Sequence, residues 1–249
     1  MVTYLKKFFR GWNAFEIIFL CLAIAVPLTL GLIFGSTWLQ IVASSTSLIV
    51  AILFAKAKIE GYVLVIVSMT TFVIVAWSER LFGEVIVQLG FALPLYIYGF
   101  VNWLRNIRKI KGDGQALELK VQKTSLKEVL LVLIVIIPIG IGVYFLLGAF
   151  NALFLLASTF ALTTGIIAVY LVARASVFNP IAYITNDISQ IVLWSLVLAY
   201  IGDIGIGAML ILPCLLAVND IYALFRWRKK YLSQQSRIEK HEEKEVSND

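Results

Sequence analysis

Four polar side chains on one apolar stretch are the residues best placed to do chemistry. Tyr183, Asn186, Asp187 and Gln190 follow one another at spacings i, i+3, i+4 and i+7. If the stretch is a helix, this spacing stacks all four on one face. The face offers a ring that can stack, two amides that donate and accept hydrogen bonds, and a carboxylate that accepts them. It is therefore suited to binding a small polar molecule.

A simpler explanation is that these side chains hold neighbouring helices together. In membranes, Asn and Gln contribute about 0.6 kcal/mol to helix pairing on average and up to about 2 kcal/mol. A charge at membrane depth costs at least about 2.5–3.5 kcal/mol, which such pairing does not offset. The stripe contains Asp187, so a lined cavity is favoured over helix pairing. Trp194 extends the stripe by one turn and offers a second ring for a flat ligand.

Two other apolar stretches carry further candidate binding residues. These are Gln88, Tyr98 and Asn102 in one stretch, and Asn219 and Tyr222 in the other. Asn219 and Tyr222 are three residues apart and so share a helical face. Asp220, between them, either joins the binding set or forms a structural ion pair with Arg174 or Arg226.

The composition requires an apolar solvent around these residues. Hydrophobic residues make up 61% of the 249, and charged residues only 14%. Soluble domains are roughly 45–50% apolar and about 25% charged. The apolar runs are continuous over about 20 residues, as membrane helices require, and do not alternate as barrel strands do. The sequence predicts an all-α integral membrane protein.

Eight membrane helices are expected along the chain. They run near residues 15–34, 37–55, 61–78, 83–104, 127–148, 150–172, 178–200 and 204–225. The tight joins at 35–37 and 148–151 are the least certain. A polar C-terminal tail follows from about residue 232, expected to be disordered or a frayed helix.

Basic residues give the expected orientation. With a cytoplasmic N-terminus, all but Arg80 of the 21 Lys and Arg residues fall in cytoplasmic segments, as the positive-inside rule favours. Both termini are therefore expected in the cytoplasm, with the chain crossing the cell (inner) membrane several times. An N-terminal signal peptide is the weaker alternative, because the charge pattern requires the first helix to stay. Five tryptophans near span ends are expected to anchor at the membrane interfaces: Trp12, Trp38, Trp77, Trp103 and Trp227.

The chain also contains a weak internal repeat. Residues 54–62 resemble residues 172–180 at an offset of 118, and Tyr98 and Trp103 match Tyr222 and Trp227 at an offset of 124. Helices two to four would then pair with helices six to eight. Two triplets in the same orientation need an odd helix between them, and the fifth helix supplies it. Parallel repeats of this kind occur in small transporters, with the substrate between the repeats.

This arrangement divides the chain into five expected segments. They are an N-terminal tail with an accessory helix (1–36), a first three-helix repeat (37–104), a basic cytoplasmic loop with the inverting helix (105–149), a second repeat (150–230) and a polar cytoplasmic tail (231–249).

Several motifs resemble the PnuC family of vitamin transporters. Lys58-Ile-Glu-Gly-Tyr62, Gly83-Glu-Val-Ile86 and the run from Leu93 to Trp103 look like the first half of that family, and Asn219-Asp-Ile-Tyr222 with Trp227-Arg-Lys looks like the end of its second half. The resemblance covers about residues 15–230. It implies a SWEET-like three-one-three fold, a trimer, and facilitated diffusion of nicotinamide riboside, with phosphorylation in the cytoplasm trapping the product. Other branches of the family carry thiamine, riboflavin or deoxynucleosides.

One departure from the family concerns the seventh helix. The family usually has Trp-x-x-Trp-x-x-Asn/Asp there, and this chain has Pro180 and Tyr183 at the two tryptophan positions. Tyr183 can still stack on a ring, whereas Pro180 cannot. The particular vitamin is therefore left open, as are ion coupling and the oligomeric state.

These observations predict a membrane transporter for nicotinamide riboside that takes part in NAD biosynthesis. Tyr183 would stack on the ring, and Asn186 and Gln190 would bind its amide and ribose. Asp187 would accept ribose hydroxyls or favour a cationic ring. Asn219 and Tyr222 would close the cytoplasmic side. Alternating access would come from rocking of one repeat against the other.

Two other classes of function are weaker. A membrane-embedded enzyme would need a nucleophile with its base, or a metal cluster. The only histidine, His241, lies in the tail, and Cys21 and Cys214 have no metal-ligand spacing. We therefore expect no catalytic residue, no metal and no cofactor. A membrane subunit without a substrate is the other alternative, and the carboxylate of Asp187 argues against it.

Overall fold

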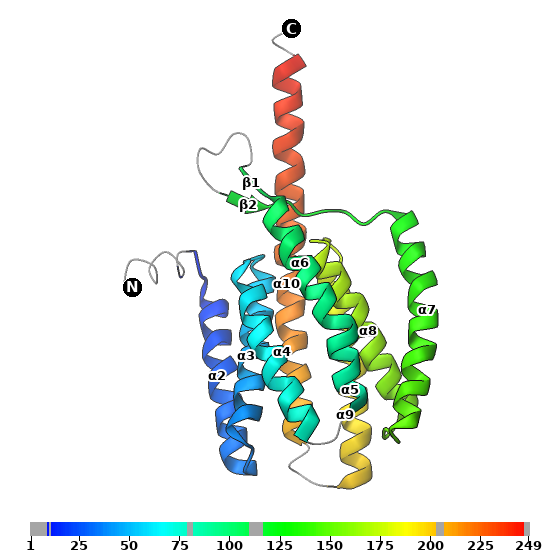
Figure 1. Cartoon of the computed structure of the whole chain (residues 1–249). Helices are drawn as coiled ribbons and strands as arrows, with labels where there is room; N and C mark the ends of the chain where they lie inside the picture. The colour runs from blue at the N-terminus through cyan, green and yellow to red at the C-terminus, as the bar shows by residue number, and fades with distance from the viewer. Residues whose placement is uncertain (1–8, 10, 79–81, 110–116, 203–206, 247–249) are drawn as a thin grey trace.

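The protein is a bundle of long helices with a small strand pair at one end (Figure 1). The computed structural model describes residues 9, 11–78, 82–109, 117–202 and 207–246. The elements in chain order are α2 (Ala14–Phe34), α3 (Trp38–Ala55), α4 (Glu60–Ser78), α5 (Phe82–Val87), η1 (Gln88–Ala92), α6 (Leu93–Asn106), β1 (Ile107–Lys109), β2 (Leu117–Leu119), α7 (Leu126–Ala149), α8 (Leu155–Ala173), α9 (Asn179–Ile201) and α10 (Gly207–Val246). Eight stretches of the described chain are long and apolar enough to cross a bilayer, since α5, η1 and α6 form one span. The predicted number of spans is confirmed.

Local sequence explains where the first helices begin and end. At the start of α2, the Asn13 side chain accepts a hydrogen bond from the Glu16 N–H, and the Glu16 side chain accepts one from the Asn13 N–H. Thr37 and Gln40 form the same reciprocal cap at the start of α3. Such caps satisfy backbone donors that the first turn leaves unpaired. Between the two helices Gly35 has a φ of 68°, which allows the tight join predicted at residues 35–37.

The predicted bounds are wrong at two places. The sixth span begins at Leu155 and not at residue 150, because Asn151 and Phe154 adopt left-handed backbone angles that no helix continues through. The eighth helix does not stop near residue 225 but continues to Val246. The tail expected as disordered or a frayed helix is therefore helical over its described part, and Figure 1 shows it rising beyond the bundle.

The central loop contains one short strand pair beside the otherwise all-helical fold. β1 and β2 are antiparallel, with Ile107 opposite Leu119. Gln234 of α10 fastens this pair: its Nε2 donates to the Leu119 carbonyl at 2.9 Å, and its Oε1 accepts from the Val121 N–H at 3.0 Å. We call this end of the bundle, where the basic residues Lys56, Arg105 and Arg174 also lie, the basic end.

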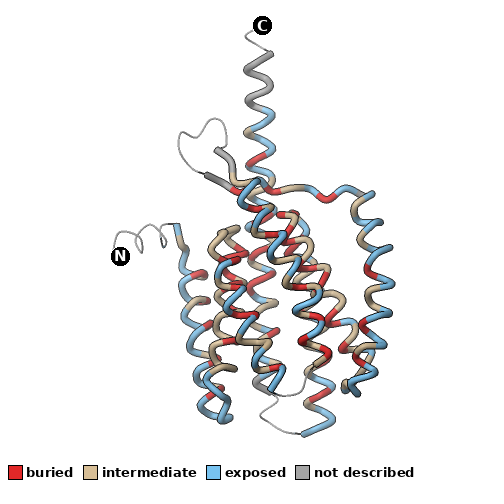
Figure 2. The backbone as a smooth tube through the Cα atoms, viewed as in Figure 1, coloured by how far each residue is buried: buried red, intermediate tan, exposed pale blue. Residues whose placement is uncertain are grey.

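The helices pack in two similar groups. α3 packs against α2, α4 and α10, while α8 packs against α7, α9 and α6. α9 and α10 also pack together along their lengths. In Figure 1, α2 and α7 lie at opposite edges of the bundle. Figure 2 shows α7 exposed along almost all of its length, as an apolar helix facing lipid would be.

Candidate functional site

The polar stripe of α9 faces two neighbouring helices and not one cavity. Asp187 turns toward α10, where its carboxyl group contacts that of Asp220. Asn186 turns toward α8: its Nδ2 donates to the Ala161 carbonyl at 2.7 Å and to Thr164 Oγ1 at 3.1 Å. Gln190 is half-buried. The stripe therefore combines the two explanations weighed for it, with Asn186 pairing helices and Asp187 lying in a polar cluster.

Three buried polar side chains form the centre of this cluster. Asp187 is 2% exposed, Asp220 7% and Asn219 0%. Asn219 Nδ2 donates to Asp220 Oδ1 at 2.9 Å, and the Asp187 and Asp220 carboxyl groups share a hydrogen bond. Asp187 Oδ2 and Asn219 Oδ1 have no hydrogen-bond partner among the described residues. Two strong acceptors thus remain to be satisfied inside the bundle.

Asp220 forms no ion pair with either arginine considered for it. Arg174 binds Glu128, and Arg226 binds Glu16. Asp220 instead contacts Asp187 and Asn219.

Tyrosines from three helices lie beside the acidic cluster. The hydroxyl groups of Tyr183 and Tyr96 are hydrogen-bonded, and Tyr183 also interacts electrostatically with Tyr62 and Asp220. The rings of Tyr62 and Tyr96 meet edge to face, with centroids 6.5 Å apart. Tyr62 is 1% exposed, and its hydroxyl has no partner within the described chain. Residues of α4, α6, α9 and α10 thus surround one polar region.

Trp194 does not reach this region. It packs against the small apolar cluster formed by Ala161, Leu193 and Val197, which joins α9 to α8. Its ring contributes to helix packing in this structure, as does the amide of Asn186.

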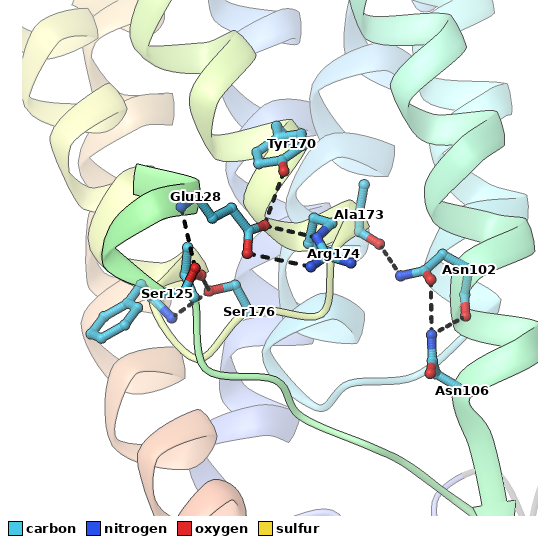
Figure 3. Close-up of polar contacts among 10 residues, drawn as sticks. Asn102, Asn106, Ser125, Glu128, Tyr170, Ala173, Arg174 and Ser176 are labelled. Carbon is cyan, nitrogen blue, oxygen red and sulfur yellow. Dashed lines mark hydrogen bonds and ion pairs between the residues drawn. The ribbon is translucent and has the colours of Figure 1, made fainter. Parts of the chain in front are cut away.

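The three candidates on the fourth span lie at different levels. Gln88 begins η1, a π-helical turn in which the Leu93 N–H donates to the Gln88 carbonyl. Pro94 lacks the N–H that an α-helical turn would need there, which accounts for the wider turn. Tyr98 is hydrogen-bonded to Arg174 at the basic end. Asn102 Nδ2 donates to the Ala173 carbonyl at 2.8 Å and so ties α6 to α8 (Figure 3).

Two acidic residues near helix starts, Glu16 and Glu128, form matching ion pairs at the basic end. We call each ion pair, with the side chains hydrogen-bonded to it, a lock. Glu128, three residues after the N-cap Ser125 of α7, accepts from Arg174 Nε at 2.8 Å and from the Tyr170 hydroxyl at 2.9 Å (Figure 3). Glu16, three residues after the N-cap Asn13 of α2, binds Lys56. Lys56 and Arg174 each follow the last residue of the next helix, so each lock ties a helix start to a helix end.

Tyr222 belongs to the lock around Glu16. It does not contact the polar cluster that contains Asn219. Its hydroxyl donates to Glu16 Oε1 at 2.7 Å and accepts from Asn13 Nδ2 at 2.8 Å. Its ring packs on Phe15 with centroids 4.4 Å apart. Tyr222 therefore fastens α10 to α2.

The lock residues outside the spans have shifted pKa values. Burial lowers the pKa of Lys56, and the hydrogen bond to Glu16 opposes that shift. The hydrogen bond to Glu128 raises the pKa of Arg174. Arg174 remains a cation under all ordinary conditions, so its lock holds a full charge pair.

Two tryptophans expected at the membrane interface are buried instead. Trp103 and Trp227 are 0% and 1% exposed. Trp103 Nε1 donates to the Val172 carbonyl at 2.7 Å, and Trp227 Nε1 donates to the Phe54 carbonyl at 3.0 Å. Each indole satisfies a carbonyl in the last turn of a helix, which explains why it lies inside. Trp38 and Trp77, by contrast, are exposed.

Sequence reasoning missed several residues of these groups. Tyr62, Tyr96, Glu16 and Glu128 were not among the candidates, although Tyr62 and Tyr96 lie in the motifs quoted above. Glu16 and Glu128 each stand three residues after Asn or Ser, before an apolar run. That pattern signals a helix start, and its occurrence before two spans could have revealed the locks.

Comparison with known proteins gives a consistent result. The sequence profile of the nicotinamide mononucleotide transporter family matches residues 37–229. A nicotinamide riboside transporter PnuC from Neisseria mucosa is 23% identical over 231 residues, which cover 90% of this chain and 84% of that protein. A protein of the same name from Haemophilus influenzae is 26% identical over 107 residues, or 43% and 47% of the two chains.

A solved structure has the same fold. It is described as the crystal structure of the vitamin B3 transporter PnuC, and it matches with a TM-score of 0.75 at 20% identity. The match covers 93% of this chain and 97% of the other.

Proposed function

The chain belongs to the nicotinamide mononucleotide transporter family, and on that premise we propose that it takes up nicotinamide riboside by facilitated diffusion. The family makes it a transporter and not an enzyme. The observation that carries the proposal is the polar region enclosed by α4, α6, α9 and α10, whose acceptors Asp187 Oδ2 and Asn219 Oδ1 lack partners within the described residues. Buried acceptors without partners are costly, and a polar substrate would satisfy them.

Matched contacts support an internal repeat as the frame of this site. At an offset of 118, Ala57 and Ala175 have φ values of 52° and 53°. The Lys58 N–H donates to the Leu53 carbonyl at 2.9 Å, just as the Ser176 N–H donates to the Leu171 carbonyl at 3.0 Å. The two indole hydrogen bonds also cross between the halves. Trp103 of the first half donates to the Val172 carbonyl of the second, and Trp227 of the second half donates to the matched carbonyl of Phe54 in the first.

The locks extend the proposed repeat by one helix. Glu16 of α2 and Glu128 of α7 hold the matched residues Lys56 and Arg174. The accessory helix and the inverting helix are then equivalent, and the chain consists of two parallel four-helix units. Each unit keeps the SWEET-like triplet expected above and adds the helix before it. An even number of spans brings the second unit back to the same side of the membrane.

The repeat gives a mechanism of alternating access. The polar region draws residues from both units, so rocking of one unit against the other would open it to each side in turn. Tyr183 would stack on the ring, while Gln190 and Asn219 would bind polar groups of the substrate. Asn186 and Tyr222 would act indirectly, by fastening α9 to α8 and α10 to α2.

The basic end supports the expected orientation, because Lys and Arg favour the cytoplasmic side. Both termini would then be cytoplasmic in the cell membrane. We also keep the homotrimer as a proposal, which rests on the family resemblance alone.

Uptake of radiolabelled nicotinamide riboside into proteoliposomes tests the proposed function. The wild type should accumulate label down its gradient, and Asp187→Ala and Asn219→Ala should reduce the rate at least tenfold. Thr185→Ala is the matched control, because Thr185 is exposed on the same helix and its hydroxyl bonds only its own backbone, at Ile181. If both variants fold and transport normally, the site assignment is wrong. Uptake of thiamine, riboflavin or a deoxynucleoside in place of nicotinamide riboside would favour a related transporter.

A further inference from the structure

The buried acidic residues of α9 and α10 form no ion pair with a basic side chain among the described residues. Asp187 and Asp220, which we call the carboxyl pair, lie inside the bundle with Asn219 beside them. Lys56 and Arg226 bind Glu16, and Arg174 binds Glu128. In the described chain, no ion pair joins a basic side chain to either member of the carboxyl pair. A buried charge without a partner is strongly unfavourable, so a positive group that enters the site would stabilise the ionised form of the pair.

The geometry of the pair also sets how much positive charge it requires. Ionised carboxylates only accept hydrogen bonds, so the hydrogen bond between Asp187 and Asp220 needs at least one proton on the pair. The pair therefore carries at most one negative charge. Asn219 Nδ2 donates to Asp220 Oδ1 and stabilises that charge, while Asp187 Oδ2 receives no donor from the described residues. One positive charge on a ligand would balance the site.

The neighbouring rings indicate the shape of the ligand. Tyr183, four residues before Asp187 and one helical turn away, interacts with Asp220 and is hydrogen-bonded to Tyr96. Tyr62 lies against Tyr96 and contributes another hydroxyl. Aromatic faces beside a carboxylate suit a flat cationic ring, which they attract through the ring quadrupole as well as by stacking.

We propose that the carboxyl pair of Asp187 and Asp220 is the counter-charge that makes this site select a cationic heteroaromatic ring over the neutral ring of the same shape. The inference rests on the proposed function and narrows its substrate class. Among the alternatives, it favours nicotinamide riboside and thiamine, which carry a positive ring, over riboflavin and deoxynucleosides, which do not. It also gives Asp220 a role in specificity equal to that of Asp187.

Nicotinamide riboside provides the sharpest test, because its reduced dihydro form has nearly the same shape and no charge. Binding of both forms to the purified wild type is measured by calorimetry, together with thiamine and riboflavin. We expect the cationic form to bind about 10- to 100-fold more tightly than the dihydro form, which corresponds to roughly 1.4–2.7 kcal/mol of charge interaction in a partly screened site. Equal binding of the two forms to the wild type would overturn the inference and leave the proposed function intact.

Variants then assign the selectivity to the pair. The double variant Asp187→Asn/Asp220→Asn keeps the shape of both side chains and removes the charge, so the ratio of the two affinities should fall to about one. Thr185→Ala should keep the wild-type ratio. An unchanged ratio in the double variant would show that the pair is not the counter-charge. Because the ratio compares two ligands on one preparation, a partly unfolded fraction lowers both signals and leaves it unaltered.

The remaining outcomes separate the inference from the proposed function. If thiamine binds, riboflavin does not, and neither nicotinamide form binds, the proposed substrate is wrong and the selection for a cationic ring holds. If riboflavin alone binds, the inference is wrong. If none of the four compounds binds the folded wild type, both the substrate and the inference are overturned.

Discussion

Replacing Trp103 by Phe tests whether the buried indoles hold the two halves of the bundle together. The Trp103 Nε1–H donates to the Val172 carbonyl at 2.7 Å, and the ring is fully buried. Phe keeps most of the ring contacts with Tyr62, Phe54 and Trp227, whose centroids lie 4.9, 5.7 and 6.0 Å away. The main loss is therefore one hydrogen bond at a helix end.

The expected cost follows from the burial of that bond. A hydrogen bond whose remaining partner stays buried and unsatisfied costs about 1–3 kcal/mol, and the smaller ring leaves a small cavity in addition. We expect Trp103→Phe to lower the free energy of unfolding by about 2–3 kcal/mol. Trp227→Phe removes the matching bond to the Phe54 carbonyl and should cost a similar amount. Denaturant titration of the purified protein in mixed micelles, followed by circular dichroism, measures both values.

Trp77→Phe is the matched control, since Trp77 is 63% exposed and its indole donates no hydrogen bond to another described residue. Its substitution should change the free energy of unfolding by less than about 0.5 kcal/mol. If Trp103→Phe and Trp227→Phe cost no more than this control, the indole bonds do not stabilise the interface. A large cost for one and none for the other would refute the equivalence of the two halves.

Two further predictions follow from the locks and from the divided stripe of α9. Glu16→Gln should lower the free energy of unfolding by about 3–5 kcal/mol, because Glu16 is fully buried. Glu128→Gln should lower it by only about 1 kcal/mol, because its partner Arg174 is partly exposed. Equal costs in denaturant titration would contradict this order. Asn186→Ala should lower the free energy of unfolding by about 1–2 kcal/mol, because it loses two hydrogen bonds to α8. Asp187→Asn should leave the free energy of unfolding unchanged or raise it, and should weaken binding of the cationic substrate. The opposite pattern in paired stability and binding measurements would reverse the roles that we give these neighbours.

The span pattern could be predicted because each span is a long apolar run, and length and composition alone determine it. The direction of each polar side chain could not. Residues at i, i+3, i+4 and i+7 cover an apolar or polar stripe about 100° wide, and a stripe of that width can contact two neighbouring helices. Asn186 and Asp187 are adjacent in sequence, so they point about 100° apart and reach α8 and α10 respectively. The helix neighbours, and not the spacing, decide which residue enters the polar region.

The tryptophans show the same limit of sequence-based prediction. An interface position is the average behaviour of Trp near span ends, and Trp38 and Trp77 are exposed as such a position requires. Trp103 and Trp227 depart from the average because a helix end lies within reach of each indole. Their shared place in the repeat was visible in the sequence at an offset of 124.

The distribution of charge connects the fold to the proposed specificity. At the basic end, Lys56 and Arg226 are held by Glu16, and Arg174 is held by Glu128. Both acids lie on the outer helices α2 and α7, which draws these cations toward the edges of the two units. The carboxyl pair on α9 and α10 is left without them. A protein that only needed Asp187 and Asp220 for stability would gain by placing one of these cations beside them, because a paired buried charge is far less costly than an unpaired one. The arrangement pairs these three cations with Glu16 and Glu128 and not with the carboxyl pair, and that is the condition under which a cation from outside can bind there.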